Sequence, residues 1–295
     1  MKQKMRRILW GLMAMGVVLA VVQNAAAGHH EKTRDKKVGI VLAAFGSSDP
    51  RTQVAFDNIE KKVSAAFPDV QVFWAYTSHM IRQKMAEQGN VLASPETALA
   101  RMADEKFTHV AVQSLHTIAG AEYHDLRRTV GAFESMGHFT EISLGDPLLG
   151  TQDSMEKAVD AIFSMIPEQR DATDAVVFMG HGSHHPANAF YAALMFQVQV
   201  KDPNIYIGTV GGYPEIDEIM PWLVEKKVKT VWLLPFMSVA GDHARNDMAG
   251  GDADSWISVL TRAGMDCRPV LKGTAEVDAF VDIWVDHLKR SMSHF

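Results

Sequence analysis

The sequence predicts an α/β protein made of two similar Rossmann-like domains, each a parallel sheet covered by helices, with a cleft between them. Short apolar runs rich in β-branched residues alternate with segments of helical spacing, which is typical of parallel sheets with right-handed crossovers. The same order of segments returns in the second half of the chain. Phe45-Gly46-Ser47 lies over His181-Gly182-Ser183 at an offset of 136, and 109–120 lies over 230–241 at an offset of 121. The domains are therefore related by internal duplication.

The first copy is expected over residues 38–165. Its first apolar run ends in glycine, and the next segment has the apolar spacing of a helix that Pro68 terminates. Ser94 followed by Pro95 is typical of a helix start, because serine caps free N–H groups and proline fits the first helical position. The expected strands are 38–45, 70–76 and 109–115, and the expected helices are 51–67, one from Pro95 and one from about Glu122.

The second copy is expected over residues 166–295 and repeats this order. A strand ends at Gly180, a turn runs from His181 to Pro186, and a helix follows. The expected strands are 175–180, 205–210 and 230–234, and the expected helices are 187–199 and 215–226.

Residues 1–27 have the features of a cleaved signal peptide. A basic start precedes an uncharged apolar run of about 15 residues over 8–22, and Ala25-Ala26-Ala27 supplies small residues for cleavage. This run is shorter than the ~20 residues that span a bilayer, so an uncleaved membrane anchor is the less favoured alternative. We expect export to the periplasm, no stable membrane span in the mature chain, and a polar mobile arm over 28–37.

Composition and motifs exclude several classes of function. Without residues 1–27 the chain holds 25 basic against 35 acidic residues, and this acidic balance argues against a nucleic-acid partner. The single cysteine, Cys267, excludes an intramolecular disulfide and a Cys-x-x-Cys zinc site. The loop 208–214 lacks the patterns of a P-loop and of a dinucleotide site, and no Gly-x-Ser-x-Gly motif is present.

The duplication indicates where the chemistry lies, because the two copies differ where predicted strands end. Open α/β sheets bind ligands at the carboxyl ends of their strands. His181 stands where the first copy has Phe45, and His243 stands where it has Glu122. We predict that the two histidines face each other across the cleft and bind a metal ion. The alternative for His181 is a loop histidine that caps the next helix.

The motifs at these positions resemble those of a known enzyme family. An apolar strand followed by His181-Gly-Ser, the loop Gly208-Thr-Val-x-Gly-Tyr-Pro214, and Val239-Ala-Gly-Asp-His243 resemble the anaerobic cobaltochelatases of cobalamin biosynthesis. These are class II chelatases, similar in fold to ferrochelatase. The resemblance spans the mature chain, and together with the signal peptide it extends to the periplasmic sirohydrochlorin cobaltochelatases. It implies insertion of Co²⁺, with Fe²⁺ also accepted, into sirohydrochlorin.

The resemblance also implies roles for individual residues. His181 and His243 would bind the incoming metal beside the macrocycle, and as imidazoles they would assist removal of the pyrrole protons. The repeat, rather than the resemblance, is expected to place Glu122 opposite His243, where it would accept a proton or orient the ring. The family pattern has a metal-binding glutamate where this chain has Gly211, so Glu215 is the candidate substitute. The candidate macrocycle contacts are Phe45, Tyr213, Phe236 and Met237, and for any single one of them an ordinary core position is the more favoured alternative. The candidate partners of the substrate carboxylates are Arg51, Arg127, Arg128 and Arg245.

Further histidines have alternative interpretations. The resemblance implies a homo-oligomer and suggests His124 as an axial ligand of haem b at a subunit contact, whereas an exposed helix histidine is the alternative. His116 is a weaker candidate for either site. We expect His184 and His185 to be rim residues that bind metal weakly or face solvent.

Two rival functions remain open at this point. One is a periplasmic haem or metal carrier that retains the chelatase fold, favoured by Gly211 and by the export signal. The other is a two-domain binding protein for a metal ion.

Overall fold

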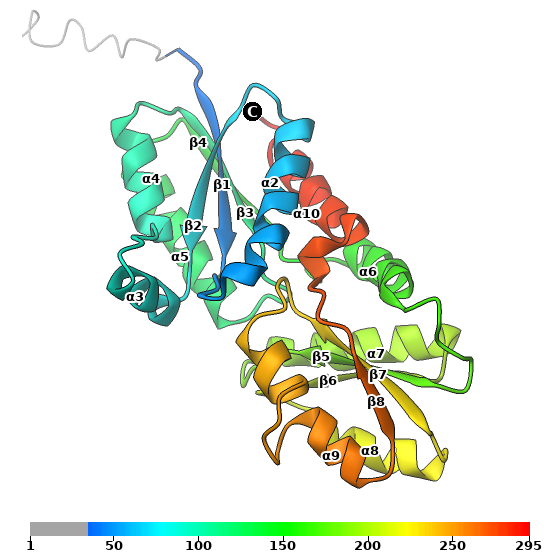
Figure 1. Ribbon diagram of the computed structural model, residues 1–295. Helices are drawn as coiled ribbons and strands as arrows, with labels where there is room; N and C mark the ends of the chain where they lie inside the picture. Colours follow the sequence, from blue (N-terminus) through cyan, green and yellow to red (C-terminus); the bar gives the residue numbers. More distant parts are fainter. Residues whose placement is uncertain (1–34) are drawn as a thin grey trace, which may run out of the picture. The chain divides into compact units, whose positions relative to one another are not determined.

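The computed structural model describes residues 35–295, and the predicted signal peptide and nearly all of the predicted arm lie outside the described residues. The described part contains two four-stranded sheets with parallel pairing throughout, ordered β2-β1-β3-β4 and β6-β5-β7-β8. Both sheets therefore have the same strand order, as the duplication predicts (Figure 1). The α/β fold class is confirmed.

The first sheet and its connections run from residue 38 to residue 165. The strands are β1 (Val38–Ala44), β2 (Gln71–Tyr76), β3 (His109–Ser114) and β4 (Glu141–Gly145). The helices are the 3₁₀ turn η1 (Pro50–Thr52), α2 (Gln53–Ala66), α3 (His79–Glu87), α4 (Pro95–Asp104), α5 (Ala121–Met136) and α6 (Gln152–Met165). The predicted cap is present, since the Ser94 hydroxyl accepts the Thr97 N–H at 3.2 Å.

The second sheet follows the same plan. Its strands are β5 (Ala175–Gly180), β6 (Ile205–Thr209), β7 (Thr230–Phe236) and β8 (Asp266–Pro269). Its connections contain the 3₁₀ turns η2 (Pro186–Asn188) and η4 (Thr274–Glu276), the short π-helix η3 (Ala244–Met248), and helices α7 (Ala189–Lys201), α8 (Ile216–Glu225) and α9 (Trp256–Arg262). The chain ends with α10 (Asp278–Ser291).

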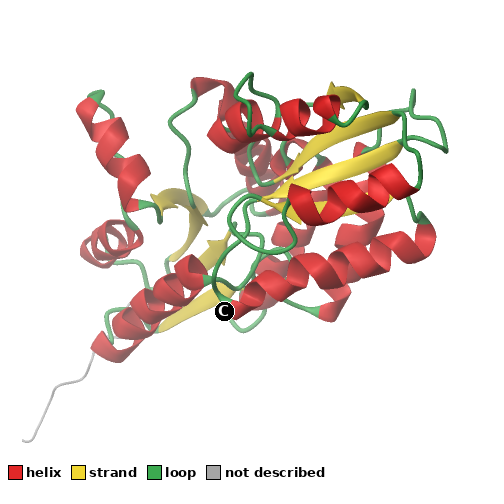
Figure 2. Cartoon of the chain, turned by 90° about the horizontal axis from the view of Figure 1, so that it is seen from below, coloured by secondary structure: helices red, strands yellow, loops and turns green. Residues whose placement is uncertain are grey.

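The central strands explain why each sheet carries helices on both faces (Figure 2). Successive side chains of a strand point to opposite faces, so a strand that is apolar at every position needs cover on both. In β1, Ile40 and Leu42 face a core shared with α2, α6 and α10, whereas Val41 faces a core with α4 and α5. In β5, Phe178 faces the same large core as Ile40, and Val177 faces a core with α8 and α9. One apolar core therefore joins the two sheets.

The last helix covers the sheet of the first half. Although α10 follows the second sheet in sequence, it packs against α2, α6, β3 and β4, beside α2 and α6 in Figure 1. Its Phe280 and Trp284 are buried in the large core. An amphipathic helix must cover an apolar surface, but its sequence does not state which sheet supplies that surface. The second half therefore extends back over the first sheet.

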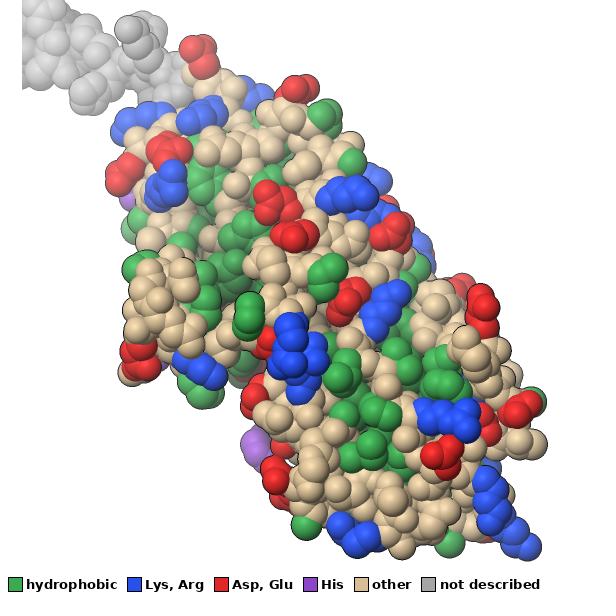
Figure 3. All heavy atoms as spheres, in the orientation of Figure 1, with side chains coloured by type: hydrophobic (Ala, Val, Ile, Leu, Met, Phe, Trp, Pro, Cys, Tyr) green, Lys and Arg blue, Asp and Glu red, His purple; other side chains and the backbone are tan. Residues whose placement is uncertain are grey.

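On the face drawn in Figure 3, basic and acidic side chains are interspersed. Within residues 35–295, no helix combines the length and the apolar character that a membrane crossing needs.

Candidate active site

The structure brings His181 and His243 together at one edge of the second sheet. His181 directly follows β5, and His243 precedes η3 after β7, which is the neighbouring strand. The ring centroids lie 4.9 Å apart with an interplanar angle of 85°. Both imidazoles come from the same sheet, because β5 and β7 are parallel neighbours whose carboxyl ends lie together. They lie next to each other, and both belong to the second half of the chain.

Hydrogen bonds determine which nitrogen of each ring is free to bind a metal. His181 Nδ1 lies 3.0 Å from the carbonyl oxygen of Gly182, and His243 Nδ1 lies 2.6 Å from Asp247 Oδ2. A carbonyl or an ionised carboxylate only accepts, so each Nδ1 carries the proton and donates. In the neutral rings the lone pair is therefore on Nε2. Both histidines are in the tautomer that binds a divalent metal through Nε2.

Asp247 contacts His243 and was not singled out from the sequence. It lies on η3, four residues after His243, and its carboxylate orients that ring. A carboxylate behind a ligating histidine is a common arrangement in metal sites, where it fixes the tautomer and raises the basicity of the ligand. The spacing alone gave no usable signal, because a carboxylate four residues from a histidine is also common on exposed helices.

Gly211, where the family pattern has a glutamate, has no side chain that could bind a metal. The Gly211 N–H donates to the carbonyl oxygen of His181 at 2.9 Å, so residue 211 adjoins the first histidine. A Cβ added at Gly211 would meet only that oxygen, at 3.4 Å. Space for a side chain exists there, but glycine supplies no donor. Among the described residues, no group of three or more His, Cys, Asp or Glu side chains is placed to hold a metal.

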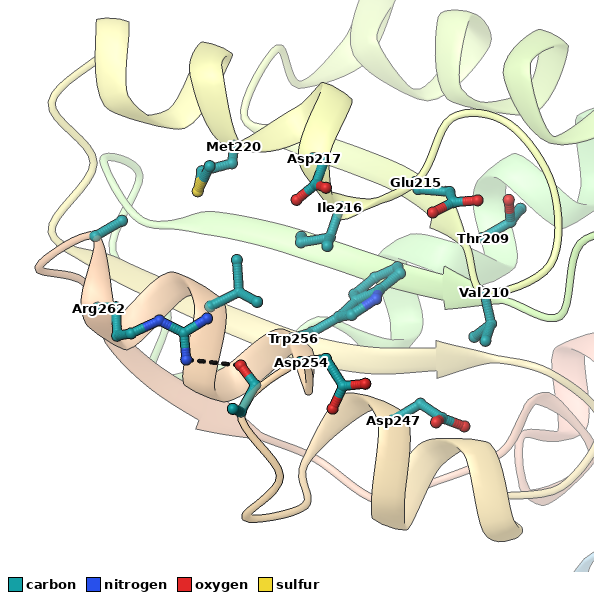
Figure 4. A pocket seen from close by; sticks show the side chains of 13 residues that line it. Thr209, Val210, Glu215, Ile216, Asp217, Met220, Asp247, Asp254, Trp256 and Arg262 are labelled. Atoms are coloured by element: carbon teal, nitrogen blue, oxygen red, sulfur yellow. Dashed lines mark hydrogen bonds between the residues drawn. The ribbon is translucent and has the colours of Figure 1, made fainter.

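Glu215, the predicted substitute ligand, lies elsewhere. It precedes α8 and lines a hollow of about 830 Å³ together with Asp217, Asp247 and Asp254 (Figure 4). The hollow reaches the carboxylate that supports His243, so Glu215 contributes to the acidic surroundings of the site. No contact of Glu215 with either histidine is present.

The first half supplies an aromatic ring and a carboxylate near the site. The Phe45 ring centroid is 5.9 Å from that of His181, and 37% of Phe45 is exposed, so it can contact a flat ligand. Glu122 lies in the first turn of α5, where its charge acts on His116 and Tyr191. The structure places Glu122 beside these residues, whereas a contact with His243 was expected from the repeat.

His116 has a structural environment rather than that of a ligand. Its Nδ1 and Nε2 lie within hydrogen-bonding distance of the hydroxyls of Ser114 (2.9 Å) and Thr77 (3.0 Å). Desolvation lowers the pKa of His116 to about 4, against the opposing effect of the Glu122 charge. The ring is therefore neutral at physiological pH and both of its nitrogens are engaged.

Two of the candidate arginines converge on Asp49, in the loop after β1. Arg51 binds the Asp49 carboxylate through Nε and Nη2, and Arg245 Nε lies 3.0 Å from Asp49 Oδ2. The hydrogen bond from Arg51, assisted by the charge of Arg245, lowers the pKa of Asp49 to about 2. Arg245 lies two residues after His243, so this ion pair holds the loop of the first half beside His243. Arg127 and Arg128 are exposed on α5.

The remaining predicted macrocycle contacts differ in exposure. Tyr213 is 68% exposed and Met237 is half-buried, so both have surface available to a ligand. Phe236 has no exposed surface and packs against Phe178, Tyr191 and Phe280. Its side chain points from β7 into the core that it shares with α10. Phe236 therefore offers no surface to a substrate.

A second pair of histidines forms between the halves. The rings of His124, on α5, and His185, in the loop after β5, have centroids 5.0 Å apart with an interplanar angle of 44°. His184 is exposed, as expected. His185 was expected to be a rim residue, and the contact with His124 is visible only in the tertiary structure.

Comparison with known proteins identifies the family. The family model described as cobalt chelatase (CbiK) matches residues 38–293. The chain belongs to this family. It is 46% identical over 257 residues to the sirohydrochlorin cobaltochelatase CbiKC of Nitratidesulfovibrio vulgaris, covering 87% of this chain and 91% of that protein. It is 36% identical over 259 residues to the sirohydrochlorin cobaltochelatase of Salmonella typhimurium, covering 87% and 97%.

Solved structures show the same fold at low sequence identity. SirB from Bacillus subtilis with Fe³⁺ matches with a TM-score of 0.61 at 16% identity, covering 88% of this chain and 97% of that one. This likeness extends the chelatase-like fold beyond the close relatives.

Proposed function

We propose that this protein is a sirohydrochlorin cobaltochelatase, which inserts Co²⁺ into sirohydrochlorin. The observation that carries the proposal is the pair of imidazoles in the segments that follow β5 and β7, each with Nδ1 bonded to an acceptor and Nε2 free for a metal. The proposal is supported by membership of the cobalt chelatase family and by the names of the two relatives.

The donor set suits transfer of a metal better than its storage. Imidazole nitrogen is a borderline ligand suited to Co²⁺, Fe²⁺ and Ni²⁺, and two neutral ligands leave coordination positions open. The macrocycle nitrogens can occupy these positions while the histidines still hold the ion. Insertion releases two pyrrole protons for each metal ion, so that the doubly deprotonated macrocycle takes the place of the protein ligands.

The same residues supply proton acceptors. A neutral imidazole that gives up the metal exposes the lone pair of Nε2, which can accept a pyrrole proton. His243 is the better placed of the two, because the Asp247 carboxylate on its Nδ1 stabilises the resulting imidazolium. His181 has only a backbone carbonyl there. We propose that Fe²⁺ is accepted by the same site for the same ligand-type reason.

The test is metal insertion by purified protein. Mixing the protein with sirohydrochlorin and Co²⁺ should change the absorbance spectrum of the macrocycle, and His181→Ala and His243→Ala should each abolish most of the rate. His184→Ala is the matched control, since it removes a neighbouring exposed imidazole. Unchanged rates in both ligand variants would overturn the assignment.

Periplasmic location and removal of residues 1–27 remain proposals. The basic start, apolar run and small-residue site in the sequence support them. Cell fractionation with N-terminal sequencing tests them, and a protein that retains Met1 in the cytoplasmic fraction would contradict both.

Haem b on His124 stays a prediction. The rings of His185 and Tyr123 lie beside His124, with centroids at 5.0 and 6.0 Å. A visible spectrum of the purified protein decides the matter. A haem spectrum together with inactivity towards sirohydrochlorin would support the carrier instead of the chelatase.

The homo-oligomer is also a proposal, and helix α7 supports it. Phe196 and Val200 are 71% and 73% exposed, and no charged side chain lies between Ala189 and Val200. In an antiparallel pairing of two copies, Ala189 would face Val200 and Ala193 would face Phe196, so small residues meet large ones. Light scattering should give a multiple of the chain mass, reduced by Phe196→Glu. A monomeric wild type would contradict the proposal.

A further inference from the structure

The contact between His124 and His185 joins the two halves of the molecule outside the metal-ligand pair. His124 belongs to the first half and His185 to the second, and their ring centroids are 5.0 Å apart. Both side chains are half-buried. The nearest acid after His124 in sequence, Asp125, is already paired with Arg128. The pair is therefore a partly enclosed set of nitrogen groups between the halves.

Hydrogen bonding distinguishes His185 from the metal ligands. The backbone N–H of Ala187 donates to His185 Nδ1 at 3.1 Å, as part of the cap of η2. A nitrogen that accepts a hydrogen bond carries no proton, so in the neutral ring the proton is on Nε2. His185 thus presents an N–H donor, whereas His181 and His243 present a lone pair at Nε2. For Nε2 of His185 to bind a metal, its proton would have to move to Nδ1, which breaks the hydrogen bond from Ala187, or be removed altogether.

The donor character of His185 suits an anion. Sirohydrochlorin carries acidic side chains on the periphery of its ring, and the metal enters at the centre. His185 lies four residues after His181, which limits its distance from the ligand histidine to roughly 14 Å even in a fully extended chain. This separation allows a carboxylate on the rim to meet His185 when the centre of the macrocycle is at His181 and His243.

We propose that His124 and His185 bind one peripheral carboxylate of the tetrapyrrole, with His185 Nε2–H as the fixed donor and His124 as the second. This inference rests on the proposed function and names a subsite of the same active site. Because the two donors come from different halves, the carboxylate connects α5 to the loop after β5. Substrate binding then holds the two halves together around the macrocycle.

The test measures binding of metal-free sirohydrochlorin by absorbance titration. His185→Phe keeps a ring of similar size and removes the donor, so Kd should rise about tenfold, as expected for one hydrogen bond to a charged group. His185→Gln retains an N–H donor and should stay within about threefold of wild type. His184→Phe, the control on the neighbouring exposed histidine, should leave Kd unchanged. His124→Phe should also raise Kd, and the double variant should lose less than the sum of the two effects.

The outcomes separate this inference from the proposed function. His185→Phe with wild-type Kd overturns the carboxylate subsite, whatever the turnover rate. Wild-type protein that binds sirohydrochlorin without inserting Co²⁺ overturns the proposed function, while the Kd series still decides the subsite. Wild-type protein that binds no sirohydrochlorin overturns both. A Co²⁺ titration without tetrapyrrole provides a further check, since loss of a bound Co²⁺ in His185→Phe would make the pair a metal site and refute the inference.

Discussion

Replacement of Asp247 should weaken metal binding without disturbing the fold. The carboxylate accepts the Nδ1–H of His243 at 2.6 Å, a length typical of a charge-assisted hydrogen bond. Such bonds are worth about 1.5–3 kcal/mol. The His243 and Asp247 side chains are 41% and 47% exposed, so solvent screening puts the value at the lower end. About 1.4 kcal/mol corresponds to a tenfold change in Kd. This agrees with the 10- to 100-fold losses of metal affinity typical of such supporting residues.

The assay is a Co²⁺ titration of the variants in the absence of tetrapyrrole, followed by insertion rates with sirohydrochlorin. Asp247→Asn keeps the shape and removes the charge, so Kd for Co²⁺ should rise about tenfold. Asp242→Asn is the matched control, because Asp242 lies on the same segment but accepts from Asn246. A purely structural role would instead lower the melting temperature without changing Kd. Equal Kd values for Asp247→Asn and Asp242→Asn would refute the reasoning.

Three other changes have expected outcomes. Gly211→Glu should lower Kd for Co²⁺ by roughly tenfold, because a carboxylate beside His181 adds a charged ligand where space exists; calorimetry that shows no gain would contradict this. The folded pKa of His116 is about 4, below the ~6.5 of an unfolded histidine, so the free energy of unfolding should fall as pH drops from 6.5 to 4. The fall is at most ~1.4 kcal/mol per pH unit. Urea titrations at several pH values should show that the free energy of unfolding of His116→Gln depends less on pH than that of the wild type. The folded pKa of Asp49 is about 2, below the unfolded ~3.9, so its stabilising effect is complete above pH ~4 and lost as pH falls through 2. Asp49→Asn, which also breaks the ion pair with Arg245, should therefore lower the melting temperature at pH 6 more than at pH 2.

The strands and helices with strong local patterns were predictable. The central strands, beginning with β1 and β5, are continuous apolar runs between glycine-containing turns, and the Ser94-Pro95 start of α4 is a local capping signal. One outer strand of each sheet, β4 or β8, was not predicted, whereas the outer strands β2 and β6 were. The alternation in β4, Glu-Ile-Ser-Leu-Gly, includes only two apolar residues, and β8, Asp-Cys-Arg-Pro, is short and mostly exposed.

The sequence by itself determined the duplication, and from it the positions of His181 and His243 at strand ends, because strand ends follow from local apolar patterns and from alignment of the two copies. Only the tertiary structure decided which groups from different segments come into contact. Asp247 behind His243, His185 against His124, Phe236 in the core, and α10 on the first sheet all depend on packing between segments or on side-chain orientation. Local periodicity fixes which face of an element is apolar. The surface against which that face packs, and the atom that each histidine proton points to, are set only when distant parts of the chain come together.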